Sequence, residues 1–167
     1  MNRRPLSVLV VLLLSASRAL CADYDPLAVP GPGKCDMLDL AVTDKGRERR
    51  LPLCVHLPVK DAAAPVVLFS HGLGGSRKGC AYLGKHWAAR GYVAVFVQHP
   101  GSDTSVWKEV PPGERMAAIK RAASARNFLL RVRDIPAVLD QLGRWNAAEG
   151  HPLRGRLDLD RVGMSGH

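Results

Sequence analysis

Val66-Val-Leu-Phe-Ser-His-Gly-Leu-Gly-Gly-Ser-Arg77 is the stretch of sequence that decides the fold. Its first half is a short, continuous apolar run, which is typical of a strand buried on both faces of a parallel sheet. Its second half holds three glycines close together, which predict a flexible loop directly after that strand. A glycine-rich loop can bring its backbone N–H groups close to a ligand.

Further elements follow on both sides of this stretch. Toward the N-terminus, residues 37–43 and 51–57 predict an antiparallel hairpin, in which Pro52 indicates an edge strand or a bulge. Toward the C-terminus, helices and buried strands alternate: a helix over 79–90, a strand over 92–97, a loop over 98–113, a helix over 114–130, a second helix capped by Asp134, and a strand over 160–165. This order predicts an α/β protein with three layers and a mostly parallel central sheet.

Composition and charge narrow the class of protein. The chain has 167 residues, of which 47% are hydrophobic and 23% charged, as expected for a globular domain. The formal net charge is +9, but the basic residues are scattered and no zinc-finger or basic-zipper pattern accompanies them. We therefore interpret the charge as a solvated basic surface and expect no nucleic-acid partner.

The N-terminal segment resembles an export signal. Arg3 and Arg4 precede an apolar run over 6–14, and small residues follow it. This pattern predicts a signal peptide over 1–22. We expect an extended lead-in over 23–34 and an α/β domain over 35–167 to follow it. The apolar run is too short to span a bilayer, so we expect a secreted or periplasmic protein without stable membrane insertion after cleavage. An uncleaved anchor or a buried strand is the alternative.

Three cysteines follow the predicted signal peptide. Cys35 and Cys54 flank the hairpin and are the candidate disulfide pair, which leaves Cys80 over. The equally weighted alternative is that all three are small buried apolar residues. No C-x-x-C motif occurs, so neither a metal site nor a cofactor is predicted.

The motifs together resemble a known superfamily. Residues 66–77, Trp87-Ala-Ala-Arg-Gly-Tyr-Val-Ala-Val95, Gln98-His-Pro-Gly-Ser-Asp103 and Leu157-Asp-Leu-Asp-Arg-Val-Gly-Met-Ser-Gly-His167 are similar to successive segments of the α/β-hydrolases. The similarity covers about residues 35–167 and is strongest to the dienelactone hydrolase-like branch, which is related to platelet-activating-factor acetylhydrolase. It implies the α/β-hydrolase fold, of which this chain is the N-terminal part only.

The resemblance assigns an oxyanion loop to His71, Gly72, Leu73 and Gly74, with the Leu73 N–H as one of two donors. Acyl transfer builds negative charge on the carbonyl oxygen, and N–H groups fixed toward that oxygen stabilise the transition state. In this fold the catalytic residues run nucleophile, acid, histidine along the chain. Because His71 precedes the nucleophile, we expect it to shape the loop through hydrogen bonds.

The nucleophile elbow, G-x-S-x-G, has two alignments in this sequence. Placing the nucleophile at Ser165 puts His167 where the last glycine should be. Starting the elbow at Gly166 and His167 puts the nucleophile at position 168, and the G-H-S start usual in the family favours this alignment. Ser165 would then be a packing residue at the end of the strand. The family favours serine at position 168, with cysteine and aspartate as alternatives that imply other chemistries.

The function implied by this alignment is that of a secreted serine hydrolase acting on a small-molecule or lipid-like ester. We expect the present chain alone to be inactive, because the nucleophile, the acid and the catalytic histidine would lie beyond residue 167. The alternative is a non-catalytic truncated remnant or an interaction protein.

The remaining polar candidates have structural interpretations. Asp103, Asp134 and Asp140 are expected to be turn or cap residues. His99 is expected to anchor the loop after its strand, with lining the pocket as the alternative, and Trp107 either covers the acyl site or is a packing residue.

Overall fold

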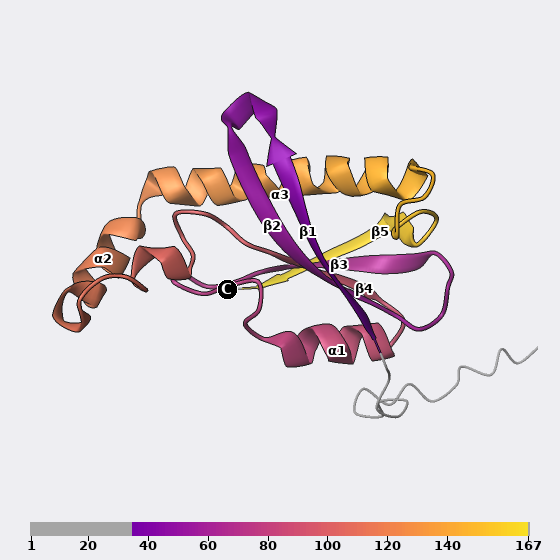
Figure 1. Ribbon diagram of the computed structural model, residues 1–167, viewed down its shortest axis with the longest axis horizontal. Coiled ribbons are helices and arrows are strands. Elements are labelled where there is room, and N and C mark those ends of the chain that lie inside the picture. Colours follow the sequence, from indigo (N-terminus) through magenta and orange to yellow (C-terminus); the bar gives the residue numbers. More distant parts are fainter. Residues whose placement is uncertain (1–34, 167) are drawn as a thin grey trace, which may run out of the picture.

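A five-stranded sheet in the order β1-β2-β4-β3-β5 is the centre of the computed structural model, which describes residues 35–166 (Figure 1). Its strands are β1 (Asp36–Asp44), β2 (Arg49–Leu57), β3 (Ala64–Ser70), β4 (Val93–Val97) and β5 (Leu157–Gly166). Within these residues β2 is antiparallel to both of its neighbours, and β3 is parallel to both of its own. The signal peptide and lead-in predicted for 1–22 and 23–34 lie outside the described residues, as does His167.

The N-terminal hairpin forms as expected, but the prediction for Pro52 is wrong. β2 lies between β1 and β4, so it is not an edge strand, and its register with β1 passes through Ala41 and Pro52 without a shift. Proline is tolerated there because the ladder with β4 begins one residue later, at Leu53, which pairs with Val97.

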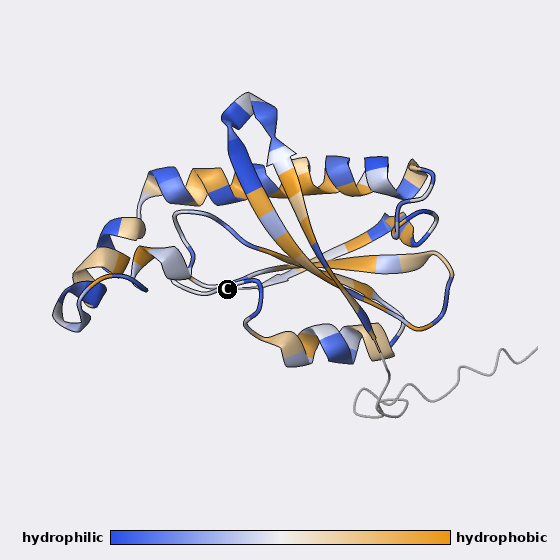
Figure 2. Cartoon of the chain, in the orientation of Figure 1, coloured by the Kyte–Doolittle hydropathy of each residue, from blue (hydrophilic) through white to orange (hydrophobic). Residues whose placement is uncertain are grey.

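The two faces of the sheet are covered by different helices, which gives the expected three layers (Figure 1). Helix α3 (Ala125–Ala147) packs on one face, where Val138 and Leu142 join the buried side chains of the strands. Helix α1 (Ala81–Ala89) covers the opposite face, where Trp87 packs against Phe69 and Phe96. Side chains alternate between the two faces along each strand, so strands buried on both faces read as continuous apolar runs (Figure 2).

The helices between β4 and β5 differ from the prediction. Helix α2 (Arg115–Ala122) ends early, and α3 begins after Ser124, whose hydroxyl accepts the N–H of Asn127 as an N-cap. Asp134 and Asp140 therefore lie inside α3, and neither is a turn or cap residue. Of the three aspartates only Asp103 fits the expectation, because it caps the short 3₁₀ helix Thr104–Val106.

All three cysteines among residues 35–166 are free thiols, so the structure does not contain the candidate disulfide. The reason is local packing: the Sγ of Cys35 lies 3.9 Å from Nδ1 of His56, and the Sγ of Cys54 lies 3.7 Å from Nε2 of the same ring. The alternative interpretation fits Cys54, which is buried, but not Cys80, which is exposed. No helix in the described part of the chain is long and apolar enough to cross a membrane.

Candidate active site

The carboxyl ends of β3 and β5 meet at one point of the sheet. Ser70, the last residue of β3, pairs with Gly166, the last residue of β5. Gly166 has φ 146°, and a Cβ atom built on it would lie 2.2 Å from the carbonyl oxygen of Ser70. Only glycine fits this contact, which is the crowding expected where a strand enters a tight elbow. The predicted oxyanion loop, which starts at His71, therefore begins beside the predicted start of the elbow.

His71 shapes the loop through both of its ring nitrogens. Its Nδ1 lies 2.8 Å from the carbonyl oxygen of Gly72, and its Nε2 accepts the backbone N–H of His99 at 3.1 Å. The ring must then be neutral, with its proton on Nδ1. Burial lowers the pKa of His71, although the hydrogen bond to Gly72 acts in the opposite direction. Both bonds fix the backbone on either side of the ring, which agrees with the expectation that His71 shapes the loop.

The outer part of the loop is fixed by neighbouring segments. The Gly74 N–H donates to the carbonyl of Ser102 at 2.8 Å, and the indole N–H of Trp107 donates to the carbonyl of Gly74 at 2.8 Å. Trp107 therefore holds the loop in place through a hydrogen bond. This role differs both from covering the acyl site and from packing alone. Within the described residues the N–H of Leu73 has no hydrogen-bond partner. This donor is free to meet a ligand oxygen, as the resemblance implies.

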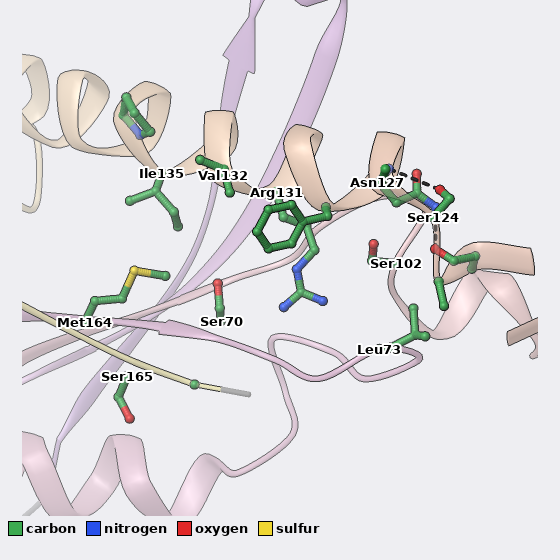
Figure 3. Close-up of a pocket in the computed structure, with 16 residues that line it drawn as sticks. Ser70, Leu73, Ser102, Ser124, Asn127, Arg131, Val132, Ile135, Met164 and Ser165 are labelled. Atoms are coloured by element: carbon green, nitrogen blue, oxygen red, sulfur yellow. Dashed lines mark hydrogen bonds between the residues drawn. The ribbon is translucent and has the colours of Figure 1, made fainter. Parts of the chain in front are cut away.

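A pocket of about 1190 Å³ opens beside this loop (Figure 3). Its lining is largely apolar and includes Leu73 and residues of α3 and β5, while Ser70 and Arg131 add polar groups. The Arg131 side chain points from α3 into this space, and its guanidinium donates to the carbonyl of His71 (Figure 3). Burial lowers the pKa of Arg131, and the charge of Asp134 partly offsets that effect.

A buried chain of hydrogen bonds lies behind the pocket, and the sequence interpretation missed it. The Oγ of Ser70 lies 2.7 Å from Nε2 of His99, and Nδ1 of His99 lies 2.9 Å from a carboxylate oxygen of Asp134. Asp134 also forms ion pairs with Arg47 and Arg49, at 3.0 and 2.8 Å. One signal was available, because Ser70 ends one buried strand, His99 lies two residues beyond the next, and the carboxyl ends of parallel strands meet at the same edge.

The remaining histidine and serine candidates take no part in this chain of hydrogen bonds, although Ser165 lines the pocket. His151 stacks on Trp145 with ring centroids 5.0 Å apart. Ser165 lies near the end of β5 as expected, but its side chain is exposed, so the described residues give it no packing role. No cluster of three or more His, Cys, Asp or Glu side chains between Cys35 and Gly166 is arranged to hold a metal ion.

Comparison with protein families and solved structures identifies the same relatives as the motifs. Residues 46–115 match the family described as platelet-activating factor acetylhydrolase, isoform II. No curated protein sequence matches the chain.

Three solved structures illustrate the similarity in fold. Dienelactone hydrolase from Anabaena variabilis has a TM-score of 0.52 and 18% identity, with 79% of this chain and 51% of that chain covered. Ferulic acid esterase from Streptomyces cinnamoneus has a TM-score of 0.55 and 22% identity, with 84% of this chain and 53% of that chain covered. Acylaminoacyl peptidase from Pyrococcus horikoshii has a TM-score of 0.53 and 22% identity, with 79% of this chain and 19% of that chain covered. The chain spans about half of the first two proteins and about a fifth of the third, and its described residues have the α/β-hydrolase fold.

Proposed function

We propose that residues 35–167 form the oxyanion-binding half of the active site of an ester hydrolase. The protein would act on a small-molecule or lipid-like ester, by the acyl-transfer chemistry of the dienelactone hydrolase and acetylhydrolase group. The similarity of residues 46–115 to platelet-activating factor acetylhydrolase, isoform II, supports this class of reaction.

One observation carries the proposal: the free N–H of Leu73 and the crowded glycine at position 166 belong to segments that meet where β3 and β5 end. A nucleophile at position 168 would lie beside this loop. It would attack the carbonyl carbon of the ester, while the loop offers an N–H donor to the carbonyl oxygen. Such pre-arranged donors commonly contribute about 3 kcal/mol of transition-state stabilisation in acyl-transfer enzymes.

The nucleophile in this proposal is the residue that follows His167 in the complete protein, and we propose that it is serine. The N–H of the residue after it supplies the second oxyanion donor, and a later acid and histidine complete the triad. The chain 1–167 alone would then lack turnover. From the N-terminal pattern of charge and apolar residues we also propose export, with residues 1–22 as the signal peptide.

A pair of protein preparations tests the proposal. The protein translated beyond His167 and the chain 1–167 are each given 4-nitrophenyl butanoate and a fluorophosphonate probe. We expect sustained hydrolysis, and labelling at position 168, only in the longer protein. Ser165→Ala in the longer protein serves as the matched control and should keep its activity. Turnover by the chain 1–167 that Ser165→Ala abolishes would refute the elbow alignment.

An interaction protein is the second candidate, and three exposed apolar side chains that line the open pocket favour it. Phe128, Val132 and Met164 are 65%, 52% and 57% exposed. Apolar side chains that form one exposed patch commonly mark a contact site for another molecule. Failure of the longer protein to hydrolyse any ester would favour this candidate.

A further inference from the structure

The hydrogen bonds that join Ser70, His99 and Asp134 have a fixed donor-to-acceptor direction. Asp134 sets this direction, because its carboxylate can only accept. Asp134 is fully buried and receives both Arg47 and Arg49. A carboxylate in contact with two guanidinium groups is ionised and accepts hydrogen bonds without donating any. The proton between His99 and Asp134 therefore belongs to Nδ1 of His99.

His99 carries that one proton and no second one. Its side chain is fully buried, and a buried ring is charged only when a counter-charge is available. Asp134 pairs with Arg47 and Arg49, and Arg47 also pairs with Asp44 at 2.6 Å, so the two carboxylates and two guanidinium groups already balance in charge. A charged His99 would add an unbalanced positive charge to this buried group, so the ring is neutral and its Nε2 has a free lone pair.

Ser70 must then be the donor in its bond to His99. Its hydroxyl lies 2.7 Å from the bare Nε2, so its only proton is directed into the protein interior. Ser70 is one of the residues that line the pocket (Figure 3), and the lone pairs of its Oγ are left to accept from a group bound there. Ser70 therefore offers the pocket a hydrogen-bond acceptor, whereas Leu73 and Arg131 offer it donors.

The position of this acceptor relates it to the reacting ester. Ser70 pairs with Gly166, where the elbow begins, and lies three residues before Leu73, whose N–H faces the ester oxygen in the proposed function. An acyl group bound between these two points has its first carbons next to the Ser70 hydroxyl. The apolar lining beyond it suits the rest of an acyl chain.

We propose that the Oγ of Ser70 accepts a hydrogen bond from a hydroxyl group close to the carbonyl of the substrate, so that the preferred substrates are esters of hydroxy acids. This inference rests on the proposed function. It makes Ser70 a specificity-determining residue, with His99 and Asp134 as positioning residues that hold its proton away from the pocket.

The first test needs no catalytic activity and uses the chain 1–167. Long-range ¹H–¹⁵N NMR distinguishes a protonated ring nitrogen from a bare one. We expect His99 to be protonated on Nδ1 and bare on Nε2 at pH 7.5, with assignment by the loss of its signals in His99→Gln. A proton on Nε2, in either the neutral or the charged ring, would make Ser70 the acceptor of that bond and would overturn the inference.

The second test measures kcat/KM of the complete protein for 4-nitrophenyl 3-hydroxybutanoate and 4-nitrophenyl butanoate. One hydrogen bond corresponds to a preference of roughly three- to tenfold for the hydroxy ester. Ser70→Ala should abolish the preference, while Ser70→Thr, which keeps a hydroxyl, should keep it.

The outcomes separate the inference from the proposed function. A preference that survives in Ser70→Ala, or that is absent in the unmodified protein, overturns the inference while the esterase assignment stands. Complete lack of hydrolysis refutes the proposed function and with it the substrate preference, whereas the NMR result still decides the direction of the Ser70 hydroxyl.

Discussion

Arg49 holds Asp134 with two parallel hydrogen bonds, from Nε to Oδ1 at 2.8 Å and from Nη2 to Oδ2 at 3.0 Å. This pair joins β2 to the middle of α3. Burial alone would raise the pKa of Asp134, but the hydrogen bonds from His99 and Arg49 outweigh it and hold that pKa below its ordinary value.

Removing the charge of Asp134 should therefore destabilise the fold strongly. We expect Asp134→Asn to lower the free energy of unfolding by about 3–5 kcal/mol, because it leaves the guanidinium of Arg49 without its counter-charge and that of Arg47 with Asp44 alone. Urea titration of both proteins gives the difference. Glu149→Gln is the matched control, since Glu149 is 86% exposed and pairs with Arg154 at the surface, where we expect no measurable change. Equal midpoints for Asp134→Asn and Glu149→Gln would contradict the prediction.

Substitution of Gly166 tests the contact at the end of β5. In Gly166→Ala the new Cβ would meet a backbone oxygen, which cannot move aside as a side chain can, and the positive φ adds strain. We expect a loss of roughly 2–4 kcal/mol in the free energy of unfolding. Gly163→Ala in the same strand has open space around its Cβ and should change stability by less than about 1 kcal/mol. A loss in Gly166→Ala no larger than in Gly163→Ala would show that the two segments are farther apart.

Gly84 is another glycine at a close contact, where α1 packs against β2. A Cβ on Gly84 would lie 2.4 Å from Cδ2 of His56, a ring that is buried and packed edge-on against Phe96. Alanine favours a helix over glycine by about 1 kcal/mol, yet we expect Gly84→Ala to destabilise by about 1–3 kcal/mol, because the ring must shift. Gly143→Ala in α3, where the nearest atom is 3.7 Å away, should be neutral or stabilising. Thermal melting should give a lower midpoint for Gly84→Ala, and an equal or higher midpoint for Gly143→Ala, than for the unmodified protein.

Acid should loosen the oxyanion loop through His71. Because burial lowers the pKa of His71 in the folded protein, the unfolded chain binds its proton at higher pH than the folded one does. The contribution of His71 is therefore complete above pH 6.5, the ordinary histidine value, and is lost as the pH falls below it toward the folded-state pKa.

The measurement is the free energy of unfolding at several pH values between 7.5 and 5. We expect His71→Gln to remove up to about 1.4 kcal/mol per pH unit from the slope, since glutamine can donate to Gly72 and accept from His99 without titrating. His56 and His151, whose pKa values burial also lowers, contribute to both proteins and cancel in the comparison. Identical slopes would mean that His71 does not control the acid response.

Local pattern was sufficient to predict much of this fold and part of the site. The apolar runs at 66–69 and 92–97 are β3 and β4, and the loop from His71 to Gly74 lies where the glycines predicted it. Two features depended on information that is not local. The break at Ser124 was missed because the apolar periodicity continues across it. The contact of Ser70, His99 and Asp134 joins residues 29 and 35 positions apart, and only the strand order brings them together.

The turn of the hairpin also has a consequence for protein engineering. Arg47, in the turn between β1 and β2, reaches α3 through Asp134 and the carbonyl of Arg133. An insertion of one residue in either strand would move every following side chain to the opposite face and would carry the guanidinium out of reach. A tag or fluorophore is better grafted near Gly113, where open space surrounds the backbone.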